Sequence, residues 1–451
     1  MGDENWKRQA LKNTEDMVLQ YRNHPSVILW GVRINESQDD DRLYEKTNEI
    51  AHELDDSRQT GGVRYLKKSH FLEDVYTYND FRHDGIDPGC EKKKNVTPDE
   101  DRPYLISECN GHMYPTKTFD SEAHRTEHML RHANVLDAVL GEGGISGVFS
   151  WCMFDYNTHP DFGSGDRICY HGVMDMYRNP KLAASLYAAQ QEEDPVLEIS
   201  SSMDIGEHPS GNPGLVYIIS NADEVRMYKG GDFVKSYYPS DSPYKNLKHG
   251  PILIDDYVGP GMGEIEGFPP KQEKDVRMLL NYGALYGYQR LPGRIKAAAL
   301  RLMLRYGMRP KDAYLLNSKY IGNWGDAAKG YRFEAVKDGR VVRTVVKAPA
   351  EKIGLYVHPD HTVLKEETSY DVSSVRIEMR DQNGNRLPFY NGAVSLKTNG
   401  PIEIIGPKTA VLRGGCGGTY VKTAGVRGEA ALILHAEQGE ETVCRFTVEK
   451  A

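Results

Sequence analysis

The sequence predicts a multidomain protein that begins with an α/β barrel-type domain and continues as two β-sandwich domains. Over residues 1–194, short apolar strand patterns alternate with amphipathic helix patterns, which is typical of parallel α/β folds. Beyond Pro195, apolar and polar residues alternate with period two, which is typical of antiparallel sheets. We therefore expect an α/β domain at 1–194, a β-sandwich with a helical insertion at 195–350, and an immunoglobulin-like β-sandwich at 351–451.

The first domain is expected to start with a helix followed by a buried strand. Apolar residues between Trp6 and Tyr21 fall on one helix face, and Pro25 ends this helix. Residues 27–32 form a continuous apolar run, as expected for a parallel strand covered on both faces. Further strands are expected at 62–66, 74–78, 104–107 and 145–151. Further helices are expected around 50–54, at 121–140, and from Asn179 to about Gln191.

The remainder of the chain carries turn signals between short strand patterns. Lys337-Asp338-Gly339 is expected to form a hairpin turn, and Asn383-Gly384 a second tight turn. A helical insertion is expected at about 259–317, clearest at 295–306, where Gly307 follows as a stop signal. We assign no chemistry to this insertion and expect it to pack or to form oligomer contacts.

Composition and charge exclude several classes of function. The formal net charge is −9 with both signs interspersed, which argues against nucleic acid or an anionic membrane as a partner. No apolar run approaches the ~18 residues that span a bilayer, and the polar start shows no signal peptide, so a cytoplasmic protein is expected. The six cysteines have no CxxC or metal-like spacing and are expected to be buried free thiols.

Two glutamates stand where predicted parallel strands end. Glu36 follows the strand at 27–32, and Glu108 follows the strand at 104–107, 72 residues later. In barrels of parallel strands, catalytic groups lie at the carboxyl ends of the strands. A βα unit averages ~30 residues, so two or three units separate the glutamates and both lie on the same rim. Enzymes that cleave glycosidic bonds typically use a pair of carboxyl groups.

The motifs around these glutamates resemble those of glycoside hydrolase family 2, the family of β-galactosidases, β-glucuronidases and β-mannosidases. The stretch from Arg22 to Ser37 resembles its acid/base signature, and Leu105-Ile106-Ser107-Glu108 is similar to its nucleophile strand. Residues 54–58 and 147–151 resemble further landmarks of the same barrel. The resemblance implies a retaining exo-β-glycosidase with Glu36 as general acid/base and Glu108 as nucleophile. Glu108 has to be ionised to attack, and its charge is expected to keep Glu36 protonated.

The resemblance also suggests residues that bind the sugar. It implies that Asn35 binds the 2-hydroxyl and that Trp151 stacks under the ring, the alternative being a core tryptophan. Tyr78 stands where the family places a tyrosine hydrogen-bonded to the nucleophile, with Tyr76 as a competitor. His112 follows the nucleophile at the spacing of substrate-binding histidines in β-galactosidases.

In the family, the acid of the Glu36 type follows the fourth barrel strand. The resemblance therefore implies a partial (β/α)8 TIM-type barrel, about strands 4–8, in this chain. We expect the carboxyl-terminal portion of a larger enzyme, as a separately encoded half, a truncated gene product or an expression fragment, because half a barrel leaves unpaired strand edges. The close alternative is an obligate assembly in which an amino-terminal partner chain or another copy covers the open edge. No cofactor is expected with certainty, since the Mg²⁺ ligands that some β-galactosidases take from earlier strands would lie outside this chain.

Several alternatives stay open at this point. A terminal β-galactoside is the first expectation for the substrate, because Asn35-Glu36-Ser37 is nearer the galactosidase form than Asn-Glu-Pro. β-Glucuronides, β-mannosides and β-glucosides are the runners-up. The rival interpretation is a non-catalytic assembly or carbohydrate-binding half of a split enzyme that keeps the signature by inheritance.

Overall fold

The computed structural model describes residues 2–82, 89–111, 114–160, 165–204, 212–322, 329–437 and 441–450. The chain forms two compact units. The first comprises residues 1–115 with 130–172, and the second comprises 116–129 with 173–451. None of the helices in these described ranges is long and apolar enough to cross a membrane.

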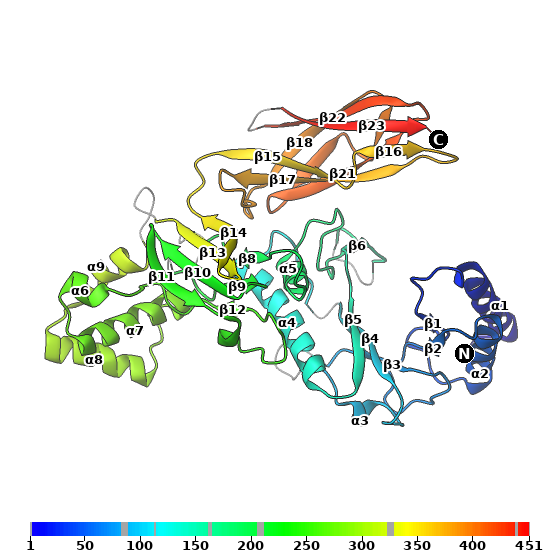
Figure 1. Cartoon of the computed structure of the whole chain (residues 1–451), viewed down its shortest axis with the longest axis horizontal. Coiled ribbons are helices and arrows are strands. Elements are labelled where there is room, and N and C mark those ends of the chain that lie inside the picture. Colours follow the sequence, from blue (N-terminus) through cyan, green and yellow to red (C-terminus); the bar gives the residue numbers. More distant parts are fainter. Residues whose placement is uncertain are drawn as a thin grey trace. The chain divides into compact units, whose positions relative to one another are not determined.

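The first unit is built around parallel strands that follow one another in chain order (Figure 1). These strands are β1 (Leu29–Gly31), β2 (Gln59–Gly61), β3 (Tyr76–Asp80), β4 (Tyr104–Asn110) and β5 (Ile145–Trp151). β1 pairs with β2, and β3, β4 and β5 form a continuous ladder. The chain beyond β2 joins the two groups, because Arg64 bridges to Tyr78 and its carbonyl accepts from Asn79 N at 2.6 Å. The result is a curled half-barrel sheet with all carboxyl ends at one edge.

Helices cover the outer face of this sheet. They are α1 (Glu4–Tyr21), α2 (Asp41–Leu54), the short α3 (Lys93–Val96) and α4 (Glu122–Gly141). Asp3 and Asp40 cap α1 and α2 by accepting from backbone N–H groups of their first turns. Val18 of α1 and Ala51 of α2 pack against Trp30 of β1 in one core cluster. The predicted helix and strand at this end are present, and their apolar faces bury each other.

The strand predicted at 27–32 is less buried than expected. Trp30 and Val32 are buried, but Ile28 is 78 % exposed and β1 covers only Leu29–Gly31. From the continuous apolar run, we expected both faces of this strand to be covered by other parts of the protein. Among the described residues, β1 also has β2 as its only neighbouring strand, so its other edge is unpaired.

A buried ion pair connects the segment that follows β2 to the loop that precedes β3. Arg64 Nη2 donates to Glu73 Oε2, and both side chains are 0 % exposed. The Arg64 guanidinium also lies 4.5 Å from the ring centroid of Tyr76. The pair fixes the chain segment that positions β3, and removing one member would leave a buried charge without its partner.

The second unit begins with two small antiparallel sheets around a shared core. One sheet has the order β12–β9–β8 and the other β11–β10–β13–β14. Their strands are β8 (Leu197–Ile199), β9 (Tyr217–Ser220), β10 (Glu224–Lys229), β11 (Asp232–Tyr237), β12 (Ile252–Leu253), β13 (Tyr331–Lys337) and β14 (Arg340–Lys347). The predicted hairpin turn is present, since Asp338 and Gly339 join β13 to β14 with φ of 52° and 73°.

Helices occupy the chain between β12 and β13. They are α6 (Met262–Glu266), α7 (Pro270–Tyr286), α8 (Gly293–Tyr306) and α9 (Pro310–Tyr320). Leu280 of α7 and Leu302 of α8 belong to the same core cluster as Phe333 of β13. The helices therefore complete the core of this β module, which gives the segment a packing role.

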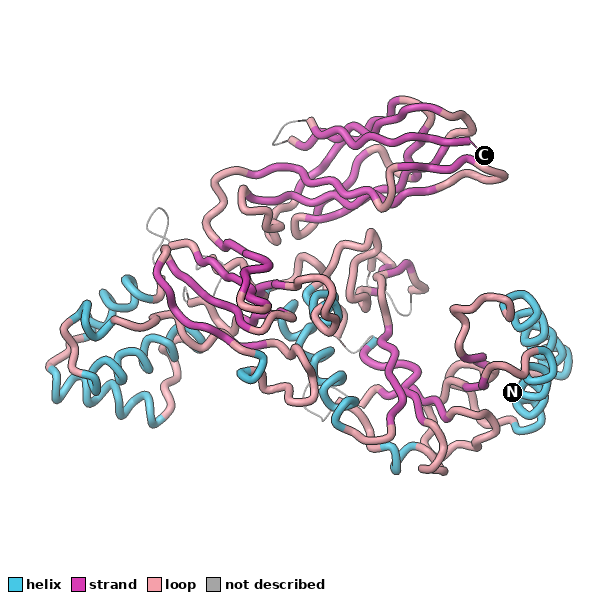
Figure 2. Tube along the Cα trace, viewed as in Figure 1, coloured by secondary structure: helices cyan, strands magenta, loops and turns pink. Residues whose placement is uncertain are grey.

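The last part of the chain is a β-sandwich (Figure 2). Its sheets have the orders β15–β17–β21–β19 and β16–β23–β22–β18–β20. The strands are β15 (Ile353–Pro359), β16 (Val363–Glu366), β17 (Val372–Asp381), β18 (Gly392–Asn399), β19 (Ile402–Ile405), β20 (Thr409–Leu412), β21 (Cys416–Thr423), β22 (Gly428–Ala436) and β23 (Thr442–Lys450). Ile377 of β17, Val421 of β21 and Leu432 of β22 lie in its core, as the alternation in sequence predicts.

Candidate active site

An irregularity in β4 determines which side chains gather at the carboxyl edge of the barrel sheet. In the β3–β4 ladder, Tyr78 lies opposite Ile106, but the next residue, Asn79, lies opposite Glu108. β4 therefore holds one extra residue, Ser107, at this point. The β4–β5 ladder shifts register in the same place. Such a bulge re-aims a side chain, and here it brings Glu108 level with Asn79.

Glu36 lies in a turn just beyond β1. Its φ is 50°, a left-handed conformation that is uncommon for a residue with a side chain. Two contacts hold the turn: Glu36 N donates to Val63 O at 3.0 Å, and Ser37 Oγ donates to Ile34 O at 2.8 Å. Ser37 Oγ also shares a 2.6 Å hydrogen bond with Tyr44 OH of α2. The strained backbone is thereby fixed to both the neighbouring strand segment and the covering helix.

One side-chain amide connects the two glutamates. Asn79 Nδ2 donates to Glu36 Oε1 at 3.1 Å and to Glu108 Oε2 at 3.1 Å. Since both oxygens lie within hydrogen-bond distance of a single nitrogen, they are at most about 6 Å apart. The sequence expectation that these side chains converge on one site agrees with this geometry.

The structure adds an effect of burial on Glu108 to the sequence expectation for this pair. We expected the charge on Glu108 to hold a proton on Glu36. In the structure, the pKa of Glu108 is raised, first by burial and then by the charge of Glu36, while the Asn79 hydrogen bond opposes both. Glu108 is half-buried at a strand end, whereas Glu36 is exposed in its turn. Burial therefore acts against the ionisation of Glu108, the expected nucleophile.

Asn35 and Trp151, two of the predicted sugar-binding residues, lie near this edge. Asn35 is exposed, and its Oδ1 is 3.3 Å from Asn79 Nδ2. Trp151 ends β5 opposite Asn110 of β4 and is 42 % exposed, so it is not a core tryptophan. Its Nε1 donates to Tyr156 OH at 3.2 Å, and the two rings meet edge to face. Both side chains are therefore accessible to a ligand.

Tyr78, a further predicted residue, is placed differently from the expectation. Tyr78 is buried in the core cluster behind the sheet together with Tyr76, and burial raises the pKa of Tyr78 to about 12. The residue that contacts Glu108 is Asn79, one position on, because successive side chains of a strand point to opposite faces. His112 lies outside the described residues.

Sequence reasoning missed Asn79 and Ser107. The alternation of the strand was a usable signal: if Tyr76 and Tyr78 face the core, then Thr77 and Asn79 face the other side. The bulge at Ser107 carries no comparable signal, because nothing in its residue type marks an inserted position.

Across the described ranges, no three His, Cys, Asp or Glu side chains are grouped so that they could hold a metal ion. That Mg²⁺ ligands come from outside this chain remains a prediction.

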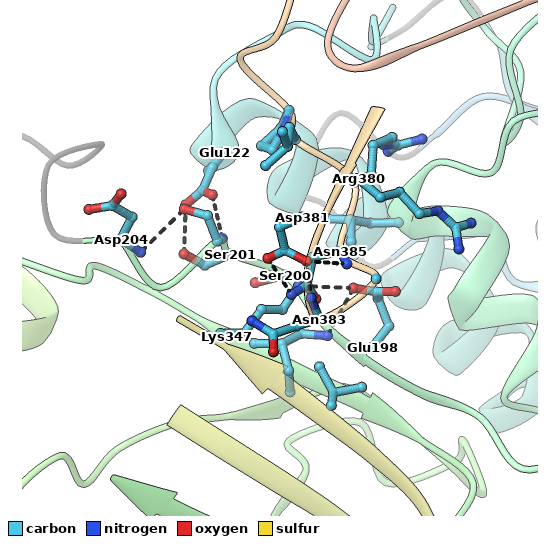
Figure 3. Close-up of a pocket in the computed structure, with 18 of the residues that line it drawn as sticks. Glu122, Glu198, Ser200, Ser201, Asp204, Lys347, Arg380, Asp381, Asn383 and Asn385 are labelled. Carbon is cyan, nitrogen blue, oxygen red and sulfur yellow. Dashed lines mark hydrogen bonds and ion pairs between the residues drawn. The ribbon is translucent and has the colours of Figure 1, made fainter. Parts of the chain in front are cut away.

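A separate cavity of about 590 Å³ lies in the second unit (Figure 3). Glu122 accepts there from Ser201 Oγ at 2.7 Å and from Ser202 N at 2.6 Å. Lys347 pairs with Glu198 at 3.8 Å. These charged side chains of the cavity are paired with other groups of the protein. The size of the cavity is therefore not enough to make it the functional site, and we place the site at Glu36 and Glu108.

Parallel strands in a curled sheet, with two linked carboxyl groups at their carboxyl ends, define a protein of the α/β barrel class. Residues 1–194 match the family model described as "Glycosyl hydrolases family 2, TIM barrel domain". The barrel domain, residues 1–194, belongs to glycosyl hydrolase family 2, as the sequence motifs predicted.

Relatives with curated names agree with this assignment. A protein named β-galactosidase from Thermoanaerobacterium thermosulfurigenes is 39 % identical over 421 residues, which are 92 % of this chain and 51 % of that protein. A β-galactosidase from Thermoanaerobacter pseudethanolicus is 35 % identical over 440 residues, 97 % of this chain and 50 % of that protein. The chain thus spans about half the length of these relatives.

Solved structures show the same fold. A β-glycosidase from Bacteroides vulgatus superposes with a TM-score of 0.61 at 14 % identity, covering 99 % of this chain and 53 % of that chain. A β-glucuronidase of family 2 gives a TM-score of 0.61 at 15 % identity, covering 100 % of this chain and 41 % of that chain. At these identities the likeness concerns the fold alone.

Proposed function

We propose that this chain carries the catalytic pair of a retaining exo-β-glycosidase, with Glu36 as general acid/base and Glu108 as nucleophile. The observation that carries the proposal is the shared hydrogen-bond donor: carboxyl oxygens of Glu36 and Glu108 each lie 3.1 Å from Asn79 Nδ2. Two carboxyl groups this close, at the carboxyl edge of a barrel sheet, suit the double displacement.

The first step forms a covalent bond to the protein. A Glu108 carboxylate oxygen attacks the anomeric carbon and the bond to the leaving-group oxygen breaks. Glu36 gives its proton to that oxygen, so the aglycone leaves as a neutral alcohol and Glu36 becomes a carboxylate. The product is a glycosyl ester on Glu108.

The second step releases the sugar. Glu36, now ionised, takes a proton from water as the water oxygen attacks the anomeric carbon, and the ester bond to Glu108 breaks. Glu108 regains its charge and Glu36 its proton. Two inversions give net retention of configuration.

A terminal β-galactoside is the proposed substrate. The relatives that cover most of this chain are named β-galactosidase, which supports this choice. β-Glucuronides, β-mannosides and β-glucosides remain the alternatives within the family. Asn35, exposed beside the pair, is placed to meet a sugar hydroxyl, and Trp151 offers a ring face for stacking.

The barrel is proposed to be completed by further strands. Within the described residues, β1 and β5 each have one neighbour in the sheet, and Phe149 on β5 is 58 % exposed. We interpret β1–β5 as barrel strands 4–8, and residues 195–350 and 351–451 as immunoglobulin-like modules. The missing neighbours would come from an amino-terminal partner chain or from a second copy, because an open apolar edge invites pairing.

A panel of nitrophenyl β-glycosides tests the proposal. We expect the native assembly of the chain to hydrolyse the β-galactoside fastest, and Glu108→Gln to lose at least about 1,000-fold in kcat. Glu49→Gln, an exposed glutamate on α2, is the matched control and should retain activity. Native mass spectrometry of the same sample identifies what completes the barrel.

The outcome also separates the enzyme from its rival. If no β-glycoside is turned over in a way that Glu108→Gln abolishes, even with the amino-terminal half supplied, the chain is a non-catalytic assembly or carbohydrate-binding half. Retention is checked by following the anomer of the first product by NMR.

A further inference from the structure

We propose that Asn79, oriented by Ser107, is a positioning residue that holds both carboxyl groups and stabilises whichever of them is ionised during the reaction. The inference rests on the proposed function of Glu36 and Glu108 and adds a third member to their site. No predicted site residue anticipated it.

The geometry of the amide supports this role. Asn79 is 2 % exposed, and its backbone N–H is fixed by a 2.6 Å hydrogen bond to Arg64 O. Its Nδ2 lies within 3.3 Å of three acceptor oxygens, on Glu36, Glu108 and Asn35. An amide nitrogen has two hydrogens, so three acceptors compete for two donors. The two carboxyl oxygens are the nearer acceptors, at 3.1 Å each.

Ser107 determines which end of the amide faces the carboxyl groups. Ser107 Oγ donates to Asn79 Oδ1 at 3.0 Å. This hydrogen bond directs Nδ2 towards the glutamates. A flipped amide would place Oδ1 against two carboxyl oxygens, where acceptors repel one another. Ser107 is the extra residue of the β4 bulge, so the irregularity that aims Glu108 also supplies the hydroxyl that orients Asn79.

The amide counteracts two effects that disfavour the ionised nucleophile. Burial and the charge of Glu36 raise the pKa of Glu108, and the Asn79 hydrogen bond lowers it. Within the described part of the chain, Glu36 is the charged group that acts on Glu108. Removing the donor leaves both unfavourable effects unopposed, so Glu108 would hold its proton to higher pH.

The same donor serves both steps of the proposed reaction. Before attack, the negative charge lies on Glu108. In the glycosyl ester Glu108 is neutral, and the charge lies on Glu36, which has given its proton to the leaving group. Asn79 Nδ2 contacts one oxygen of each carboxyl group. An N–H donor therefore faces the ionised carboxylate in both states, where a charge-assisted hydrogen bond is strongest.

Variants of similar size separate this electrostatic role from packing. Asn79→Leu removes the donor and keeps the approximate volume. Asn79→Asp keeps the shape but places a third carboxyl group against the pair. Ser107→Ala leaves the amide in place without its orienting partner. Asn95→Leu, at an exposed position in α3, is the control for the change of residue type.

The pH dependence of kcat/KM is the decisive kinetic measurement, made on the chain in its native assembly. We expect Asn79→Leu to lose about 100-fold, with the acid limb moved to higher pH because Glu108 ionises later. Asn79→Asp should move the acid limb further in the same direction, and Ser107→Ala should lose about tenfold. Asn95→Leu should match the wild type.

A second measurement is independent of turnover. The Glu108 carboxyl carbon, labelled with ¹³C and assigned by comparison with Glu108→Gln, is titrated by NMR in the wild type and in Asn79→Leu. A higher midpoint in the variant supports the inference even if no glycoside is hydrolysed. An unchanged midpoint in Asn79→Leu, together with unchanged acid limbs in both folded Asn79 variants, would overturn it, leaving Asn79 a packing residue and the roles of the glutamates untouched.

Discussion

Asn79 lies opposite Glu108 in the β3–β4 ladder, although regular pairing after Tyr78 and Ile106 would have placed it opposite Ser107. This single-residue shift puts the Asn79 amide 3.1 Å from the Glu108 carboxylate. As a result, the Asn79 side chain of β3 contacts both Glu108 of β4 and Glu36 in the turn after β1. The predictions below concern this arrangement and the elements that support it.

Replacing Glu36 should affect substrates according to their leaving groups. Without the acid, Glu36→Ala is expected to lose about 1,000-fold in kcat/KM on alkyl β-galactosides, which need protonation, and far less on a dinitrophenyl β-galactoside, which does not. The measurement is kcat/KM across a series of aryl and alkyl leaving groups. Equal losses for all members of the series would contradict the acid role, and that pattern is instead expected for Glu108→Gln.

Glu108→Gln should raise stability at neutral pH. A carboxyl group whose pKa is raised by folding stabilises the native state most when it is protonated, and this contribution is lost as pH rises through its native pKa. At about pH 7 the wild type holds a partly buried charge that Gln does not carry. The variant should therefore unfold at higher denaturant concentration than the wild type at about pH 7, and at nearly the same concentration at about pH 4.

Urea titrations at both pH values measure this difference. Glu49→Gln, at an exposed position, is the control and should show no pH-dependent gain. A gain for Glu108→Gln that is equal at both pH values would instead indicate a change in packing.

Truncating Trp151 should weaken substrate binding more than it slows chemistry. The side chain is 42 % exposed at the end of β5, so Trp151→Ala costs little core packing but removes a stacking surface. We expect KM to rise about tenfold or more, with a smaller change in kcat, and Trp151→Phe to recover part of the loss. Tyr156→Phe removes the hydroxyl that Trp151 Nε1 contacts and should have a minor effect on KM. A change confined to kcat would argue against stacking.

The buried pair of Arg64 and Glu73 should be a major determinant of stability in the first unit. Both side chains are 0 % exposed, so Arg64→Met leaves the Glu73 carboxylate buried without its partner. We expect a loss of about 3–5 kcal/mol in the free energy of unfolding. The double replacement Arg64→Met with Glu73→Leu should recover much of it, because no charge then remains buried. Denaturant unfolding of the two variants measures the difference.

A surface pair provides the comparison. Lys12 and Asp16 lie 2.7 Å apart on the exposed side of α1, and Lys12→Met should have little effect on unfolding. A large effect of Lys12→Met, or a negligible one of Arg64→Met, would show that burial does not govern these pairs.

The sequence determined the features that depend on local pattern. Glu36 follows β1 and Glu108 lies near the end of β4, in the predicted order, because apolar runs and the residues that end them can be read from the order of residue types along the chain. The Asp338-Gly339 turn was predictable for the same kind of reason, since few residues tolerate positive φ at both central positions of a two-residue hairpin. The family motifs then supplied the expected chemistry of the pair.

Tertiary structure decided which neighbours these residues have. Tyr78 was expected beside the nucleophile, but it faces the core, and Asn79 takes that place because the bulge at Ser107 shifts the register between two strands. Likewise, the raised pKa of Glu108 depends first on burial, that is, on how the side chain is enclosed. Strand register and side-chain burial arise from contacts between segments far apart in the chain. They therefore cannot be predicted from the local sequence pattern.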